Sequence, residues 1–180
     1  KWLDEGRGAV PVSVNLSRVG FYNPKLSDNL YRIAEKYQIP LDLIELEVTE
    51  SAYVTDSRTV HDHIQQLRER GFKILMDDFG SGYSSLNMLK EAPVDQIKLD
   101  MKFLSASDPY GRAETILHMV IAMGKALSIP VLAEGVETKS QVEMLKSYSC
   151  CLAQGYYYAR PLTVDKFEEL LKAQEEQPGT

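Results

Sequence analysis

Short apolar runs alternate with amphipathic stretches along almost the whole chain. The apolar runs occupy residues 10–16 (VPVSVNL), 43–48 (LIELEV), 73–78 (KILMDD), 95–100 (DQIKLD), 130–136 (PVLAEGV) and 151–156 (CLAQGY). Runs of this length that are rich in aliphatic and β-branched residues are typical of buried strands. The pattern therefore predicts six strands.

Between these runs, apolar residues recur at the spacing of a helix face. We predict helices over about residues 24–37, 56–70, 84–90, 112–127, 138–147 and 164–173. The apolar positions at helical spacing are Leu26, Leu30, Ile33, Ala34 and Tyr37, then Val60, Ile64 and Leu67, and later Ile116, Met119, Val120 and Met123. Thr138 and Gln141 have the spacing of a capping box, which predicts a helix start there.

Strands that alternate with helices indicate parallel strands joined by crossover helices, either in an open sheet or in a barrel. Each predicted strand ends on polar residues: Asn15, Glu47 or Glu50, Asp77 and Asp78, Lys98, Glu134 and Gln154. Six such ends favour the mouth of a barrel, and the segment GSGYSS lacks the glycine pattern of a dinucleotide site. We expect an incomplete (β/α)8 TIM-like barrel, because eight strands need roughly 250 residues.

Composition sets the class of protein and limits its partners. The 180 residues are 44% hydrophobic and 26% charged, which predicts one globular domain. The predicted strands and helices place its core over residues 8–173, and we expect a frayed tail over residues 174–180. A net charge of −6 argues against a partner that is a nucleic acid polymer or an anionic membrane surface. Cys150 and Cys151 are neighbours, so we expect two free thiols in a reducing cytoplasm.

The adjacent carboxylates Asp77 and Asp78 follow a strongly apolar strand. Burying two anions side by side is costly unless something positive binds them. Carboxylate and amide oxygens suit Mg²⁺ or Mn²⁺, whereas His61, His63 and His118 fall on predicted helices, which argues against zinc.

Each polar strand end also has an ordinary structural explanation. Asn15 could cap a turn, Glu50 could be a loop carboxylate, and Lys98 could be a surface lysine, although Ile97 and Leu99 flank it. All of these explanations together are improbable, so the set indicates a site for divalent cations.

Six motifs occur in a fixed order: SVNLS, ELEVTES, MDDFGSGYSSL, IKLD, AEGVET and QGYYYARP. Over residues 8–170 the chain resembles the EAL domain of bacterial cyclic di-GMP phosphodiesterases. The resemblance implies a β/α barrel that hydrolyses cyclic di-GMP to linear pGpG with two Mg²⁺ or Mn²⁺ ions. It also implies a role in bacterial signal transduction and biofilm regulation.

The resemblance assigns roles residue by residue. Asn15, Glu47 and Asp77 match ligands of a first metal ion, and Asp77, Asp78 and Glu134 match ligands of a second. Lys98 would hold the attacking water or a phosphate oxygen, and Gln154 would support Glu134. Glu50 would stabilise the substrate loop that includes Phe79, Gly80, Ser81 and Gly82.

The resemblance also implies partners and a location. We expect a homodimer, and upstream sensor or GGDEF-like domains in a longer cytoplasmic parent protein that could be anchored to a membrane elsewhere.

One departure from the family pattern matters. The Glu-Ala-Leu motif of the first strand is absent, and the opening KWLDEGRG resembles the end of an earlier helix. We therefore expect a fragment that lacks the first strands, that is weakly active or inactive alone, and that exposes sheet edges to aggregation. The alternative is a catalytically silent domain that acts as a cyclic di-GMP receptor or a dimerisation module.

Overall fold

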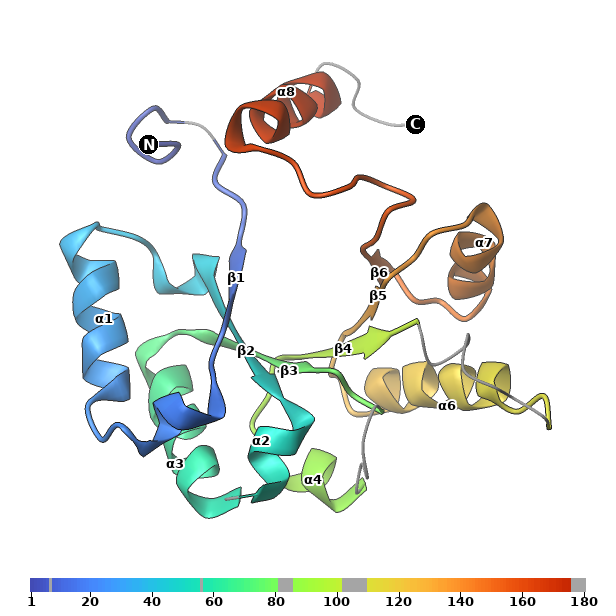
Figure 1. The fold of residues 1–180 in the computed structure, drawn as a ribbon, viewed down its shortest axis with the longest axis horizontal. Coiled ribbons are helices and arrows are strands. Elements are labelled where there is room, and N and C mark those ends of the chain that lie inside the picture. Colours follow the sequence, from blue (N-terminus) through green and yellow to red (C-terminus); the bar gives the residue numbers. More distant parts are fainter. Residues whose placement is uncertain (7, 56, 81–85, 102–109, 176–180) are drawn as a thin grey trace.

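In the computed structural model, six parallel strands form one sheet in the order of the chain, β1-β2-β3-β4-β5-β6 (Figure 1). The structure describes residues 1–6, 8–55, 57–80, 86–101 and 110–175. The strands are β1 (Val12–Asn15), β2 (Ile44–Thr49), β3 (Lys73–Asp77), β4 (Gln96–Asp100), β5 (Val131–Glu134) and β6 (Leu152–Ala153). The sheet curves into a half-barrel, which confirms the predicted incomplete (β/α) barrel.

Helices follow the strands, and all but the last lie around the outside of the curved sheet; the last, drawn in red, stands apart from the sheet in this view (Figure 1). They are α1 (Leu26–Lys36), α2 (Glu50–Thr55), α3 (Ser57–Arg70), α4 (Leu86–Glu91), α6 (Ala113–Ala126), α7 (Lys139–Ser147) and α8 (Val164–Glu175), with 3-10 turns at Arg18–Tyr22 and Leu41–Leu43. The predicted capping box at Thr138 and Gln141 is present. Residues 176–180 of the expected frayed tail lie outside the described residues, and α8 continues to Glu175.

Alternation along the strands separates an apolar outer face from a polar inner face. Leu46, Ile74 and Ile97 are fully buried, and the outer face of the sheet packs against the helices. Neighbouring strands place Asn15 opposite Glu47, Thr49 opposite Asp77, and Asp100 opposite Glu134. Because the sheet is parallel, this register brings the polar carboxyl ends of the strands to one rim.

Two predicted helix faces differ from the structure. Of the first predicted face, Leu26, Leu30 and Ala34 pack in or against the core, but Ile33 of α1 and Tyr37 just after it are exposed. In α6, Val120 and Met123 pack against the core, but Ile116 and Met119 are exposed. The buried residues of α6 are Leu117, Ile121 and Gly124.

The position of Gly124 explains this rotation of α6. A Cβ at residue 124 would lie 2.5 Å from Val131 Cγ2 and 2.8 Å from the carbonyl oxygen of Ile129. The glycine therefore lets α6 approach β5 closely, and it turns the helix away from the face that the larger residues suggested.

Helices α1, α3, α6 and α7 end in the same way before the next strand begins. After α6, the Ser128 N–H donates to Lys125 and the Ile129 N–H donates to Gly124, and after α7 the Ser149 and Cys150 N–H groups repeat this pattern. These are Schellman motifs, in which the residue after the cap adopts the left-handed conformation. Ser128 and Ser149 both have φ of 59°, which is a conformation that favours glycine.

Glycine at Ser128 or Ser149 is therefore expected to stabilise the chain. Glycine removes the strain energy of a left-handed serine in the folded chain, and it also increases the conformational entropy of the unfolded chain. We expect the first effect to be larger, so each change should raise the free energy of unfolding by about 0.5 kcal/mol. Urea denaturation measures the effect. Ser140→Gly, inside α7, is the control and should lower stability. Destabilisation by all three changes would contradict this explanation of the helix ends.

The two outer strands of the half-barrel have open sides. Within the described ranges, β1 pairs only with β2, and β6 pairs only with β5. Val12 and Val14 of β1 are 55% and 48% exposed. The described part of the chain contains no helix that is long and apolar enough to cross a membrane.

Candidate active site

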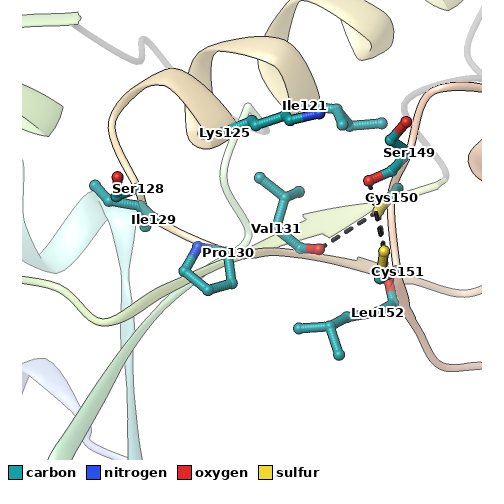
Figure 2. A pocket seen from close by; sticks show the side chains of 11 residues that line it. Ile121, Lys125, Ser128, Ile129, Pro130, Val131, Ser149, Cys150, Cys151 and Leu152 are labelled. Atoms are coloured by element: carbon teal, nitrogen blue, oxygen red, sulfur yellow. Dashed lines mark hydrogen bonds between the residues drawn. The ribbon is translucent and has the colours of Figure 1, made fainter.

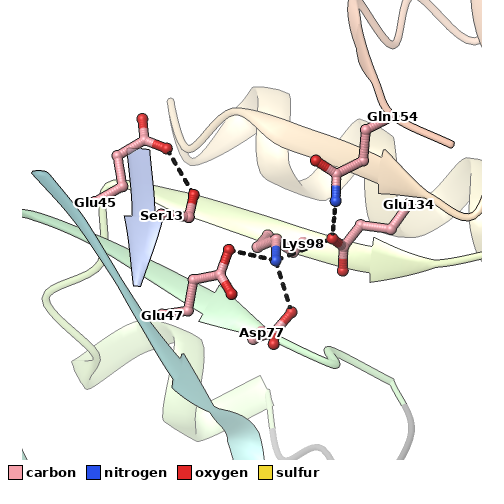
Figure 3. Close-up of polar contacts among 7 residues, drawn as sticks. All are labelled: Ser13, Glu45, Glu47, Asp77, Lys98, Glu134 and Gln154. Atoms are coloured by element: carbon pink, nitrogen blue, oxygen red, sulfur yellow. Dashed lines mark hydrogen bonds and ion pairs between the residues drawn. The ribbon is translucent and has the colours of Figure 1, made fainter. Parts of the chain in front are cut away.

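A single ammonium group joins three strand ends at the rim of the half-barrel. Lys98 Nζ lies 2.6 Å from Glu47 Oε1, 3.1 Å from Asp77 Oδ1 and 2.9 Å from Glu134 Oε1. Figure 3 shows these side chains converging from β2, β3, β4 and β5. Polar residues far apart in the sequence therefore meet at one point, as the polar strand ends predicted.

The cluster is buried and carries excess negative charge. Lys98 is 5% exposed and Glu47 is 7% exposed. Three carboxylates and one ammonium leave a net charge of −2 in the cluster. Such an excess in a poorly solvated place is unfavourable, so the cluster has a strong electrostatic preference for additional positive charge.

The protonation of the cluster reflects this balance. Burial opposes the charge of Lys98, but its hydrogen bonds to Glu47, Glu134 and Asp77 outweigh burial and raise its pKa well above the ordinary value. Lys98 therefore stays charged throughout the physiological pH range. Burial is also the main reason that the pKa of Glu134 is raised, with a further contribution from Asp77, while Lys98 opposes this shift.

Two further predicted residues surround the cluster. Gln154, directly after β6, donates a hydrogen bond from Nε2 to Glu134 Oε1. Glu50, which is 3% exposed at the start of α2, accepts a hydrogen bond from the Gly80 N–H at 3.1 Å. The Phe79 N–H donates to the carbonyl oxygen of Lys98 at 3.1 Å, so the segment after β3 is attached to both β4 and α2.

Two predicted residues are placed apart from this group, and two others lie outside the described residues. Asn15 ends the outer strand β1 in register with Glu47, but its side chain is exposed and makes no hydrogen bond within the described residues. Asp78 is exposed and has φ of 55°, so its carboxylate follows a turn in the backbone after Asp77. Ser81 and Gly82 of the predicted substrate loop lie outside the described residues.

The donor atoms of the cluster have the chemistry of a site for hard cations. Carboxylate and amide oxygens are the preferred ligands of Mg²⁺ and Mn²⁺. Within the described ranges, no three His, Cys, Asp or Glu side chains are arranged to hold a metal ion, because the carboxylates are spread around the ammonium of Lys98. The residues fit divalent cations in type and charge, and cation binding would require the carboxylates to rearrange around Lys98.

Sequence reasoning missed polar residues on the same inner face. Ser13 Oγ donates to Glu45 Oε2 at 3.1 Å (Figure 3), and these residues precede Asn15 and Glu47 by two positions along β1 and β2. Asp100, at the end of β4, lies opposite Glu134 in the strand register. The signal was the two-residue period of the strands, since Glu45 and Glu47 must share a face, as must Lys98 and Asp100.

A separate hollow of about 420 Å³ lies at the opposite, amino-terminal end of β5 and β6 (Figure 2). Both cysteines line it and both are free, with Cys150 buried and Cys151 exposed. The Cys150 thiol donates to the carbonyl oxygen of Val131 at 3.4 Å. Burial raises the pKa of the Cys150 thiol, so this thiol resists ionisation.

Cys151 is therefore expected to react with iodoacetamide much faster than Cys150. The thiolate is the reactive form, and an exposed thiol forms and presents it more readily than a buried one. Alkylation at pH 8, followed by peptide mass spectrometry, measures both rates. A faster reaction at Cys150 in the folded chain would contradict the assigned burial, and equal rates in urea provide the control.

Comparison with known proteins gives a consistent family relationship. The model of the EAL domain family matches residues 1–161. The cyclic di-GMP phosphodiesterase NbdA of Pseudomonas aeruginosa is 36% identical over 168 residues, which cover 93% of this chain and 22% of NbdA. The chain thus spans about a fifth of the length of this curated relative.

Solved structures show the same fold. The EAL domain of Mycobacterium smegmatis DcpA aligns with a TM-score of 0.86 at 31% identity, covering 96% of this chain and 78% of that structure. Klebsiella pneumoniae BlrP1, in a complex with manganese and cyclic di-GMP, aligns with a TM-score of 0.78 at 31% identity, covering 86% of this chain and 40% of BlrP1.

Proposed function

The chain belongs to the EAL domain family, and from this premise we propose that its Glu47–Asp77–Lys98–Glu134 cluster hydrolyses cyclic di-GMP to linear pGpG. The observation that carries the proposal is the convergence of three carboxylates on one buried lysine at the carboxyl ends of parallel strands. In β/α barrels this rim carries the active site. Named phosphodiesterase relatives and the cyclic di-GMP complex of BlrP1 support the choice of substrate.

We propose that Mg²⁺ or Mn²⁺ completes the site. Asn15, Glu47 and Asp77 would hold one ion, and Asp77, Asp78 and Glu134 would hold a second. When bound, two such ions lower the pKa of water and offset the charge of the phosphodiester. The excess negative charge of the cluster supports this proposal, as does the manganese in BlrP1.

The chain's own residues then orient the reaction. Lys98 Nζ can hold the attacking water by a hydrogen bond. Alternatively, its positive charge can stabilise a phosphate oxygen that becomes more negative in the transition state. Gln154 keeps the Glu134 carboxylate in one orientation. Glu50 holds the backbone of Gly80, and thereby the segment that carries Asp78, against α2.

The open edges of the sheet bear on how fast the isolated chain works. With β1 and β6 each unpaired on one side in the described structure, Asn15 is exposed rather than enclosed. We therefore propose that turnover by the 180-residue chain is slow. We also propose that the chain belongs to a longer cytoplasmic protein with upstream sensor or GGDEF-like domains, since the chain spans about a fifth of NbdA. We propose that this longer protein forms a homodimer.

Product analysis tests the proposed function. Cyclic di-GMP is incubated with a high concentration of the chain and Mn²⁺, and anion-exchange chromatography separates the products. We expect linear pGpG to accumulate in proportion to the chain, and EDTA to stop it. Tight binding of cyclic di-GMP without pGpG would favour the receptor function instead. Neither binding nor product would contradict both.

A further inference from the structure

The hollow at the amino-terminal ends of β5 and β6 has a buried apolar floor (Figure 2). Ile121 of α6, Val131 of β5 and Cys150 before β6 line it, and they are only 4%, 8% and 8% exposed. Its volume of about 420 Å³ is within the range of small-molecule sites in proteins. A small apolar group that entered this hollow would therefore lose much of its contact with water.

The rim of the hollow leaves apolar surface in contact with water. Leu152 of the edge strand β6 lines the hollow and is 40% exposed, and the exposed Cys151 lies next to it. In Figure 2, Ile121 lies above Val131, and Cys151 and Leu152 lie below it. An occupant between these residues would cover Leu152, and the removal of this apolar surface from water would favour binding.

Lys125 supplies the charge of the hollow. It is the one charged residue among the described residues that line the hollow. In the part of the chain that the structure describes, its ammonium takes part in no ion pair or hydrogen bond. Lys125 lies in the last turn of α6, where a cation offsets the helix dipole. That ordinary role explains its position and leaves the ammonium available to an anion.

An apolar floor with a single cation at its rim matches a molecule that has one negative head group on an apolar chain. A straight-chain carboxylate has both parts, and lysine, as a point charge, can bind its head group without a fixed planar geometry. A membrane surface matches less well. The net charge of −6 opposes approach to anionic lipids, and the volume suits one short chain.

We propose that this hollow binds a medium-chain fatty carboxylate, with the alkyl chain against Val131 and Leu152 and the carboxylate beside Lys125. The proposal does not rest on hydrolysis of cyclic di-GMP, because the hollow and the carboxylate cluster lie at opposite ends of the strands. Cys151 lines the same hollow, so the occupant would limit access to its thiol.

Alkylation of Cys151 in the presence of carboxylates tests the proposal. The chain is treated with iodoacetamide at pH 8 and increasing hexanoate, octanoate or decanoate, and peptide mass spectrometry gives the rates at both cysteines. We expect slower alkylation of Cys151. The concentration that halves its rate should fall about fourfold for each added methylene group. The titration uses only concentrations at which the rate at the buried Cys150 is unchanged, so that the fold is retained.

Lys125→Met tests the head group. It should raise the half-protecting concentration of decanoate about threefold to fivefold and leave that of decanol, which has no charge, unchanged. Lys146→Met is the matched control, because Lys146 is also exposed in the last turn of a helix but does not line the hollow. Each variant is compared with its own rate without ligand, so a change in the reactivity of the thiol itself does not affect the result.

Absence of protection by decanoate, or protection that does not depend on chain length, would overturn the proposed site. An equal change for decanoate and decanol in the Lys125 variant would overturn the assignment of the carboxylate to Lys125. Neither result would affect the proposed hydrolysis at the opposite rim.

Discussion

Replacing Lys98 by methionine is expected to lower the free energy of unfolding by about 3–5 kcal/mol in metal-free buffer. Lys98 is almost fully buried and is the counter-charge for Glu47, Asp77 and Glu134. Methionine keeps the length of the side chain but leaves three carboxylates that repel one another in a poorly solvated place. Urea denaturation followed by circular dichroism measures the loss.

Mn²⁺ should restore part of this stability, because a ligand that binds only the folded state stabilises it. Lys139→Met is the matched control, since Lys139 is exposed and its nitrogen lies 3.6 Å from Glu143 on the same helix. Exposed pairs of this kind contribute about 0–1 kcal/mol. A loss below about 1 kcal/mol in the Lys98 variant would show that the carboxylates do not depend on Lys98.

Asp77→Asn is expected to lower the rate of pGpG formation at least about a hundredfold. Asp77 is the proposed ligand common to both ions, and even residues that only orient metal ligands typically change activity by about 10–100-fold. The change removes one negative charge with almost no change in shape, so the fold should be retained. Initial rates with Mn²⁺ measure the activity. The decrease of the electron paramagnetic resonance signal of free Mn²⁺ on binding measures the affinity.

Asp42→Asn provides the comparison for charge alone, because Asp42 is exposed in the 3-10 turn before β2. It should keep the rate and the Mn²⁺ affinity of the unaltered chain. If Asp77→Asn retained more than about a tenth of the rate, Asp77 would not be a shared ligand, and the assignment of two ions to this cluster would be wrong.

Much of the fold was predictable from periodicity. Alternating strands and helices predicted a parallel sheet, and the polar strand ends predicted one functional rim; the structure confirms the half-barrel. Helix orientation was less predictable. The apolar residues of α6 offer more than one possible face, and the contact of Gly124 with Val131 and Ile129 selects among them. A glycine gives no hydrophobic signal, so periodicity could not reveal this choice.

The candidate site was predictable as a set of residues, but not in its internal contacts. The sequence indicated that Glu47, Asp77, Lys98 and Glu134 would share a rim, and they do. It did not indicate that Lys98 would contact all three carboxylates, because that depends on the register of four strands. A cavity of about 590 Å³ lined by Gln154 and Phe167 was also not predictable, since it forms between β5, β6 and α8, which meet only in the folded chain.

The location of bound Mn²⁺ in crystals of the chain tests the central claim most directly. Anomalous diffraction at the manganese edge should place two ions beside Asp77, one toward Glu47 and one toward Glu134, with Lys98 displaced from at least one carboxylate. An anomalous peak elsewhere on the molecule, or none at a Mn²⁺ concentration that supports pGpG formation, would show that these strand ends do not jointly bind the catalytic ions.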